Sequence, residues 1–376
     1  MVQILTVYGP AFLIALSVLV FFHELGHYLA ARWNGVRVEV FSIGFGRELF
    51  GWTDSHGTRW KFSIMPLGGY VKMFGDVNAA SAGSPEIEGL SPDEKAVCFQ
   101  TKRVGQRAAI VFAGPLANYI LAVVILALLY IFVGQQSTPA VVNEVLPGSA
   151  AAVAGIKPGD KVVMVDGSAI ERFEELRQVV SLRPDQTMQM DVLRDGHIVH
   201  LTVTPQRHRF QDKFGNWHEI GLLGVGGRGV ETVRYGPATA LWRAVIETKS
   251  VTGATITSIG QMFAGTRKTD DIGGPLRIAE MSGQMIKLGP VEFIWFLAVL
   301  SLHLGLINLV PVPMLDGGHL LFYGIEALRG RPLGERAQEY GFKIGLALVL
   351  TLMVFATWND LFVHFRVVDL IKGLVS

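Results

Sequence analysis

Residues 4–27 constrain this chain most, because they join an uncharged apolar run to a metal-binding pattern. No charged residue occurs from position 4 to 22, which predicts the greater part of a membrane-spanning helix. The run leads directly into His23-Glu24-Leu25-Gly26-His27, an H-E-x-x-H pattern. Positions i and i+4 share a helix face, so His23 and His27 can bind one zinc ion while Glu24 lies beside them as a base. The sequence therefore predicts a zinc hydrolase site at membrane depth.

This short pattern also arises by chance in soluble helices, where paired histidines are often structural. Ionisable side chains are costly in or near hydrocarbon, however, and the setting therefore favours function. Composition agrees with a membrane protein that carries a water-soluble insert, since 50% of the 376 residues are hydrophobic and only 17% are charged. The first apolar run lacks a preceding basic segment and is expected to remain as a span.

The net charge and the cysteine count bear on the possible partners and metal ligands. A formal net charge of +1, without a zinc finger or basic stripe, gives no reason to expect nucleic acid as a partner. The single cysteine, Cys98, excludes an intrachain disulfide framework and leaves the metal to histidine and carboxylate ligands.

Alternating apolar and polar residues follow the first span, at 36–45 and again at 59–74, separated by glycine-rich turns. This period predicts β-hairpins. Two interpretations stay open: a small sheet that merely caps the protein, or a strand edge with which an extended substrate pairs. Residues 76–100 are polar and predict a loop.

A second apolar stretch, at 108–133, is long enough to cross a membrane and contains Gly114-Pro115-Leu116-Ala117-Asn118. Small residues permit close helix approach, and an amide within a span usually bonds a neighbouring helix. For Asn118 we therefore favour packing over a direct catalytic role.

The third span, at about 293–310, runs into Pro311 and Pro313 and then Leu315-Asp316-Gly317-Gly318-His319. Such a break is tolerated at membrane depth only inside protein or beside a wet cavity. We expect Asp316 to be the third zinc ligand rather than a helix cap, which leaves a fourth position for water. His319 is a rival ligand that we favour as support for Asp316. The isolated His303 is expected to be packed or hydrogen-bonded to a neighbouring helix.

Composition changes to that of a soluble α/β module between residues 139 and 207. The Gly155 and Gly159-Asp160 turns and the strands around them resemble a PDZ domain of the bacterial protease-associated kind, in which a peptide adds as an extra strand. A spacer that binds no peptide is the alternative. Residues 208–234 predict a linker with scattered glycines, and 237–265 predict interfacial helices too polar to span.

The predicted fold is a polytopic α-helical membrane protein with four transmembrane helices, a membrane-associated β-hairpin region and an inserted α/β PDZ-like domain. Lys and Arg concentrate in segments 32–107 and 329–343, which the positive-inside rule places in the cytoplasm. The zinc site then lies toward the cytoplasm and the PDZ-like domain on the opposite side. The predicted segments are a first helix with the zinc motif (1–34), a loop with reentrant β-hairpins (35–103), a second helix (104–134), the PDZ-like domain (139–207), a linker with interfacial amphipathic helices (208–290), a third helix with the Asp-bearing break (291–327) and a fourth helix (339–366).

Taken in order along nearly the whole chain, these motifs resemble those of site-2 proteases, intramembrane zinc metalloproteases of the bacterial RseP type. The resemblance implies that His23, His27 and Asp316 bind Zn²⁺ and that Glu24 activates water. It also implies substrate binding by Asn308 and by the hairpin at 62–74, which contains Gly68 and Gly69 and would clamp the substrate in extended form. One departure is that the best-known members carry two tandem PDZ domains, whereas one is found here.

The resemblance implies a multi-pass protein of the bacterial inner membrane whose PDZ-like domain is periplasmic. Its substrates would be single-span membrane proteins already cut on the far side, such as anti-sigma factors, and remnant signal peptides, cleaved in regulated intramembrane proteolysis. The PDZ-like domain would recognise or exclude the remaining peptide stump. A substrate helix must first unwind, and each freed backbone group costs several kcal/mol in hydrocarbon unless a strand edge pairs with it.

Two other functions are less consistent with the sequence. A membrane-anchored PDZ peptide-binding module with a structural zinc is disfavoured because structural zinc usually has four protein ligands. A transporter is disfavoured because the sequence lacks paired broken spans in matching halves.

Overall fold

The computed structural model describes residues 7–75, 89–211, 217–227, 229, 231–264 and 273–364. The chain divides into two compact units. The helical unit comprises Met1–Leu126, Arg243–Thr252 and Gly273–Asp360, and the β-rich unit comprises Ala127–Trp242, Gly253–Ile272 and Leu361–Ser376. Helices α3 (Val104–Phe132) and α6 (Pro237–Phe263) contribute residues to both units.

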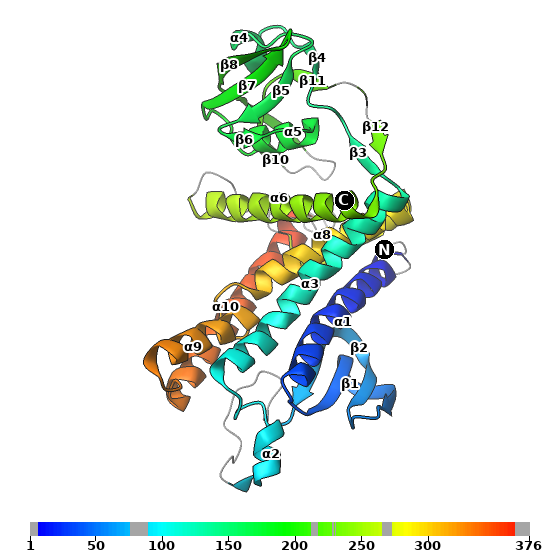
Figure 1. Ribbon diagram of the computed structural model, residues 1–376, viewed down its shortest axis with the longest axis vertical. Coiled ribbons are helices and arrows are strands. Elements are labelled where there is room, and N and C mark those ends of the chain that lie inside the picture. The colour runs from blue at the N-terminus through cyan, green and yellow to red at the C-terminus, as the bar shows by residue number, and fades with distance from the viewer. Residues whose placement is uncertain are drawn as a thin grey trace, which may run out of the picture. The chain divides into compact units, whose positions relative to one another are not determined.

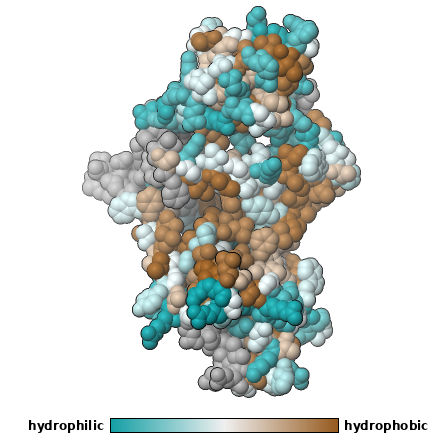
Figure 2. Space-filling model, turned by 60° about the vertical axis from the view of Figure 1, so that its left-hand side comes forward, coloured by the Kyte–Doolittle hydropathy of each residue, from teal (hydrophilic) through white to brown (hydrophobic). Residues whose placement is uncertain are grey.

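Among the described residues, 4 helices are long and apolar enough to cross a membrane, which agrees with the predicted number of spans. They are α1 (Gly9–Trp33), α3, α8 (Pro290–Asn308) and Arg336–Leu361, the last of which joins most of α10 (Glu335–Trp358) to a π-helical turn (Asn359–His364) (Figure 1). Their outward faces carry exposed apolar side chains, and Figure 2 shows such side chains gathered over the middle of one face. Helix α6 is not one of the four, as its polarity predicted.

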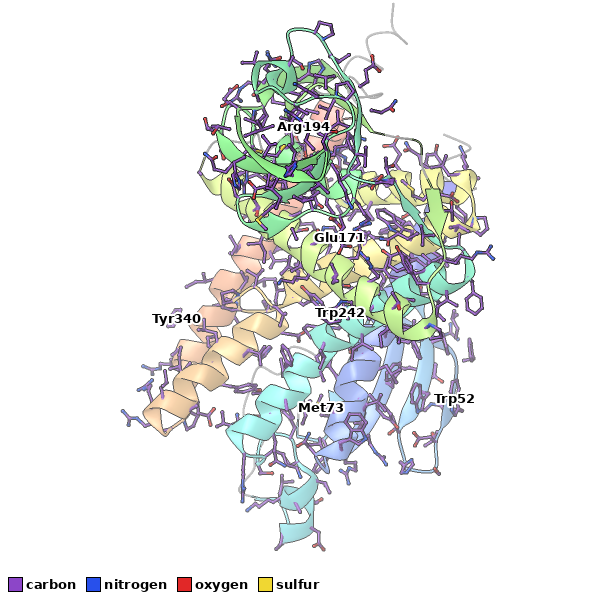
Figure 3. The ribbon with its side chains drawn as sticks, turned by 45° about the horizontal axis from the view of Figure 1, so that its top comes forward. Trp52, Met73, Glu171, Arg194, Trp242 and Tyr340 are labelled. Carbon is purple, nitrogen blue, oxygen red and sulfur yellow. The ribbon has the colours of Figure 1, made fainter. Side chains whose placement is uncertain are left out.

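Strands β1 (Val38–Thr53) and β2 (Arg59–Met73) form one antiparallel sheet in which each strand is bent into two arms. Val40 pairs with both Arg59 and Lys72, so the first arm of β1 lies between the two arms of β2. The order across the sheet is 48–53, 59–63, 38–43 and 69–73. Trp52 and Met73, labelled in Figure 3, belong to the two outermost arms. The region 69–73, which we call the edge arm, therefore has one edge without a strand neighbour among the described strands.

Short helices and polar contacts fix the ends of the helical unit. Helix α2 (Pro92–Val97) begins with a capping box of Ser91 and Glu94. Helix α7 (Pro275–Leu288) is capped by the buried Asp360, whose carboxylate accepts from three backbone amides near the start of α7, those of Gly274, Leu276 and Arg277, at 2.8, 3.1 and 3.1 Å. Helix α9 (Asp316–Arg329) is tied to α3 by an ion pair between Glu326 and Arg107 at 2.6 Å.

The β-rich unit contains a four-stranded sheet around an aliphatic core. Its order is β6 (Ser168–Ala169), β5 (Lys161–Val165), β7 (Met188–Arg194) and β8 (His197–Val203). Helices α4 (Ala150–Val153) and α5 (Phe173–Ser181) contribute to the core, in which Leu176, Met190 and Val192 are buried. The aliphatic face of α5 and the alternate residues of β7 therefore supply one continuous hydrophobic interior.

The linker predicted at 208–234 is wrong in its described part, because most of those residues form strands. β9 (Gln206–Gln211) pairs with β10 (Trp217–Leu222), and β11 (Val225–Gly227) pairs with β4 (Val142–Val145). The module thus extends past residue 207. Scattered glycines suggested a linker, but at 226–227 they lie in a ladder with β4, and Gly227 lies close to Thr138 and Phe173. Pairing across such a sequence separation has no local signature.

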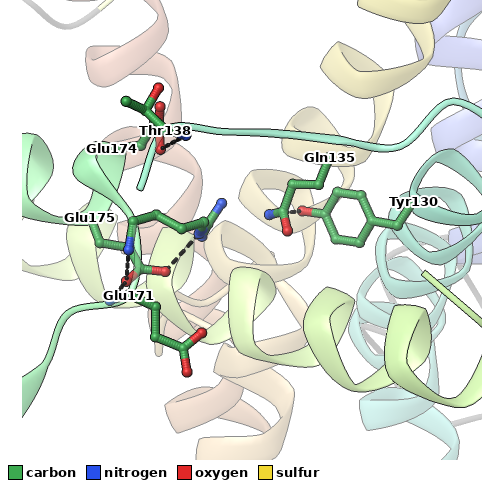
Figure 4. Close-up of polar contacts among 7 residues, drawn as sticks. Tyr130, Gln135, Thr138, Glu171, Glu174 and Glu175 are labelled. Atoms are coloured by element: carbon green, nitrogen blue, oxygen red, sulfur yellow. Dashed lines mark hydrogen bonds and ion pairs between the residues drawn. The ribbon is translucent and has the colours of Figure 1, made fainter. Parts of the chain in front are cut away.

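Strands β3 (Gln135–Ser137) and β12 (Glu231–Val233) form another antiparallel ladder, which lies between the β4–β11 pair and α3 along the chain. Polar contacts around it are shown in Figure 4: Gln135 donates to the Tyr130 hydroxyl at 3.1 Å and the Thr138 amide donates to Glu174 at 3.3 Å. We call the β3–β12 pair the neck. The chain enters and leaves the module through adjacent, hydrogen-bonded strands.

Candidate metal centre

Three potential metal ligands from two helices converge in the helical unit. His23 and His27 lie on one face of α1, and Asp316 is the first residue of α9. His23 Nε2 lies 3.2 Å from Asp316 Oδ2, and His27 Nε2 lies 3.6 Å from Asp316 Oδ1. The two Nε2 atoms are 3.3 Å apart. The ligand atoms of all three side chains lie within 4.8 Å of one another, so they can face a single ion.

The chemistry of this group fits zinc. Asp316 Oδ2 is buried and has no hydrogen-bond partner among the described residues, although His23 Nε2 lies 3.2 Å from it. A buried carboxylate oxygen without a donor is unfavourable unless a cation satisfies it. Two imidazoles and one carboxylate form a donor set typical of catalytic zinc, and three protein ligands leave one position open.

Helix α3 holds His27 in the orientation that metal binding requires. His27 Nδ1 donates to the Ile110 carbonyl at 2.9 Å, which leaves the Nε2 lone pair directed at Asp316. The two helices cross closely here: a Cβ at Gly114 would overlap the His27 ring, and a Cβ at Gly26 would overlap the Ala113 carbonyl. The predicted role of small residues in close helix approach is therefore confirmed.

Asn118, also on α3, contacts the other histidine. Its side-chain amide lies 3.1 Å from His23 Nδ1, and its backbone carbonyl accepts from the Ser301 hydroxyl of α8 at 2.8 Å. Asn118 and Ser301 are both fully buried. The expectation that this amide bonds a neighbouring helix is correct, and the bonded atom belongs to a candidate metal ligand.

Glu24 lies against the edge arm of the bent sheet. Its carboxylate accepts a hydrogen bond from the Val71 backbone amide. A Cβ at Gly69 would lie 3.2 Å from Glu24 Cγ, so glycine gives the arm room to approach α1. Sequence reasoning missed Val71, because it contributes through its backbone and carries no chemical signature.

The break before Asp316 is a tight return of the chain. Met314 has a φ of 86°, and Leu315 donates its amide to the Val312 carbonyl at 3.0 Å. A Cβ at Gly317 would overlap the carbonyls of Leu309 and Val310. The glycines thus let α9 start directly against the end of α8, which places Asp316 at the histidines.

The other predicted residues lie outside this group. His319 packs against the rings of Tyr323 and Phe342, with centroids 6.5 and 5.3 Å away, and no hydrogen bond joins it to Asp316 in the described part of the chain. Asn308 is the half-buried last residue of α8. His303 bonds the Val299 carbonyl of its own helix. Gly68 has a φ of 137° and adjoins Phe45.

An apolar pocket of about 260 Å³ opens between α1 and the bent sheet. Phe21 and Phe22 line it from α1, immediately before the zinc motif, and Ile43, Phe62 and Pro66 line it from the sheet. It adjoins the motif without containing any of the three potential ligands.

Comparison with known proteins shows the family of the chain. The family model described as Peptidase family M50 matches residues 11–352. A Rhizobium meliloti (strain 1021) protein named "Putative zinc metalloprotease R01501" is 48% identical over 359 residues, covering 94% of this chain and 96% of that protein. "Putative zinc metalloprotease Atu1380" of Agrobacterium fabrum is 48% identical over 362 residues, covering 95% and 96%. "Metalloprotease MmpA" of Caulobacter vibrioides is 39% identical over 377 residues, covering 93% and 94%.

Proposed function

The chain belongs to peptidase family M50, the site-2 protease family, and from this premise we propose that it hydrolyses peptide bonds within the transmembrane segments of single-span membrane proteins. It is a zinc metalloendopeptidase, and the described part of the chain contains four helices able to span a bilayer. The observation that carries the proposal is the buried Asp316 oxygen, which faces two histidines and lacks a hydrogen-bond donor in the described chain.

His23, His27 and Asp316 would hold the zinc ion. Zinc bound there supplies Lewis-acid activation of water and of the scissile carbonyl. Glu24, beside the two histidines, would take a proton from the attacking water and return it to the departing amine. The Val71 amide that bonds the Glu24 carboxylate would keep this base in place before substrate arrives.

The edge arm supplies a means of binding an unwound substrate. A transmembrane helix hides its carbonyls in internal hydrogen bonds, so it must open before hydrolysis, and in hydrocarbon the freed groups need new partners. Because the arm at 69–73 has one edge without a strand neighbour among the described strands and lies against Glu24, a substrate strand added there would lie beside the base. Asn308, at the end of α8, would contact the same substrate.

The module at 139–227 would act on the far-side stump of the substrate. Its resemblance to a PDZ domain is supported by β11, which pairs with β4 and has no other strand partner among the described strands. A peptide could therefore add beside β11 as a further strand. We assign the native substrates to single-span proteins already cut on that side, including the anti-sigma factor type and remnant signal peptides, in regulated intramembrane proteolysis.

The proposed location is the bacterial inner membrane, with the active site toward the cytoplasm and the module in the periplasm. The concentration of Lys and Arg before Arg107 and after Leu328 supports this orientation.

The decisive experiment uses the purified full chain with a single-span substrate truncated on the far side. We expect cleavage within the span, loss of cleavage with chelator, and recovery on adding zinc. Glu24→Gln is the matched control, because the amide keeps the shape but lacks the base, and it should keep zinc while losing about 10²–10⁴-fold in rate. Cleavage that survives complete removal of metal would refute the proposal.

A further inference from the structure

The hydrogen-bond partners of the two histidine Nδ1 atoms both belong to α3. Ile110 accepts from His27 Nδ1 through its backbone carbonyl, whereas the group facing His23 Nδ1 is the side chain of Asn118. The helices run in opposite directions here, since the earlier histidine meets the later α3 residue. One helix therefore orients both imidazoles, but only the contact at Asn118 depends on a side chain.

We propose that Asn118 is a positioning residue for the metal: its side-chain oxygen accepts the Nδ1–H of His23 and thereby directs the Nε2 lone pair into the site. This rests on the proposed role of His23 as a zinc ligand. Asn118 would touch neither zinc nor substrate and would act only through the His23 ring.

The chemistry of His23 determines which amide atom must face it. If the Asn118 nitrogen donated to Nδ1, the ring proton would sit on Nε2, the nitrogen that lies 3.2 Å from Asp316 Oδ2. A protonated Nε2 cannot bind a metal. The structure places Asn118 Nδ2 at 3.1 Å from His23 Nδ1 and leaves Asn118 Oδ1 buried without a hydrogen-bond partner among the described residues. The oxygen and nitrogen of a carboxamide have nearly the same shape, so the two can be exchanged, and the requirement for an unprotonated Nε2 selects the flipped orientation with oxygen toward His23. In this orientation the Asn118 side-chain nitrogen, instead of the oxygen, lacks a hydrogen-bond partner. Metal binding by His23 is the reason for preferring it.

Burial makes this contact effective. Asn118 is 0% exposed, so bulk water cannot take over its hydrogen bond to His23. The Ser301 hydroxyl bonds the Asn118 backbone carbonyl and ties this point of α3 to α8. Hydrogen-bond partners of metal-bound histidines typically change metal affinity by 10–100-fold when removed.

A purely structural role for Asn118, in which the amide only packs α1 against α3, gives a different expectation. Packing depends on the volume of the side chain, whereas positioning depends on an acceptor. Asn118→Leu keeps most of the volume without an acceptor, and Asn118→Asp keeps both. Ser301→Ala is the matched control, because it removes a buried hydrogen bond to Asn118 without altering the contact with His23.

The test measures zinc affinity of the full chain in detergent by competition with a chromogenic chelator, without reference to proteolysis. We expect Asn118→Leu to weaken zinc binding 10–100-fold, Ser301→Ala to stay within about threefold of wild type, and Asn118→Asp to bind at least as tightly as wild type, because a charged acceptor is stronger. Histidine ¹⁵N spectra of the zinc form should show His23 protonated at Nδ1 in the wild type and in Asn118→Asp.

Three results would overturn the inference. One is Asn118→Leu that binds zinc as tightly as wild type. Another is Asn118→Asp that folds but binds as weakly as Asn118→Leu. The third is wild-type His23 with its proton on Nε2 while zinc is bound. If Asn118→Leu does not fold, the Asp variant and the spectra still decide. A wild-type protein whose zinc affinity is unchanged by His23→Ala would instead refute the proposed function, on which the inference rests.

Discussion

Asp160 in the β-rich unit and Asp316 in the helical unit both hold carboxylate oxygens away from solvent, yet their surroundings differ: Asp160 is buried as a whole, whereas the Asp316 side chain is 17% exposed and only its Oδ2 atom is buried. Asp160 is 1% exposed and fully paired: Arg194 donates from Nε and Nη2 at 2.7 Å each, and the Lys157 amide donates at 2.8 Å. Arg194 is labelled within the module in Figure 3. The contacts of Asp316 are with His23 and His27, and its Oδ2 has no hydrogen-bond partner among the described residues.

The difference separates two uses of a buried charge. A carboxylate with all its hydrogen bonds in place stabilises the fold around it, whereas one with an unsatisfied oxygen is unfavourable until something else binds. In the module the turn at Asp160 is complete as folded. In the helical unit the fold holds Asp316 in an unfavourable state, as expected where function rather than stability determines the residue.

The largest effect is expected from Asp316→Ala. This variant should lose zinc, and with it all measurable proteolysis, while its thermal unfolding in metal-free buffer stays at or above that of the wild type, because the unsatisfied oxygen is gone. Metal analysis and unfolding of the same preparation provide the measurements. A variant that kept stoichiometric zinc would remove Asp316 from the ligand set.

Asp160→Ala should show the opposite pattern, with zinc retained and the module destabilised. Removing one partner of a buried ion pair costs about 3–5 kcal/mol, and we expect the lower end because Arg194 is partly exposed. Hydrogen exchange of peptides from β5 and β7 in the full chain should speed up about 100-fold. Unchanged exchange would mean that Asp160 is no more important than a surface residue.

Low pH should also destabilise the module, because the pKa of Asp160 differs between its folded and unfolded states. Burial alone would raise that pKa, but the hydrogen bonds from Arg194 and the Lys157 amide lower it below the usual value. The stabilisation is therefore complete above the unfolded-state pKa of about 3.9 and is lost as pH falls through the lower folded-state value.

Exchange protection of β5 and β7, corrected for intrinsic rates, should accordingly be constant from neutral pH to about 5 and should fall below about 4. Asp160→Asn provides the control, since it removes this group's share of the pH dependence. An equal slope in both proteins would assign the acid sensitivity to other groups.

The smallest effect is expected from His319→Ala. His319 contacts Tyr323 and Phe342 rather than hydrogen bonding to Asp316, so zinc affinity should fall by less than about tenfold. Stability should decrease modestly through lost packing. If His319→Ala lost zinc and Asp316→Ala kept it, His319 would be the third ligand.

The candidate metal ligands could be predicted from the sequence because they lie in short local patterns. The H-E-x-x-H spacing places two histidines on one helix face, and the proline-glycine break before Asp316 interrupts a span. Few functions other than metal binding require either arrangement. Together these two patterns predicted the group that the structure brings within 4.8 Å. The four spans followed from runs of apolar residues, which are equally local.

Contacts between distant segments left no such pattern. The bend that turns β1 and β2 into four arms, the pairing of β11 with β4, and the Val71 amide at Glu24 depend on backbone groups that every residue carries. The same limit affects experimental design. Proline at Gly68 or Gly69 is a natural probe of a strand edge, yet Gly68 has a φ of 137°, which proline cannot adopt. A Cβ at Gly69 would lie 2.7 Å from the Ser42 carbonyl oxygen and 3.2 Å from Glu24 Cγ, so that change would also disturb Glu24.

The neck bears on how such a chain can gain or lose a domain. Because β3 and β12 are hydrogen-bonded neighbours, the chain departs and returns at points about 5 Å apart. A tight turn could close that gap, so the whole module between residues 138 and 230 could be deleted, exchanged or duplicated in one genetic event without stretching the flanking chain. The neck thus lets the module be removed or replaced as one unit, with both ends of the break left at adjacent positions of the chain.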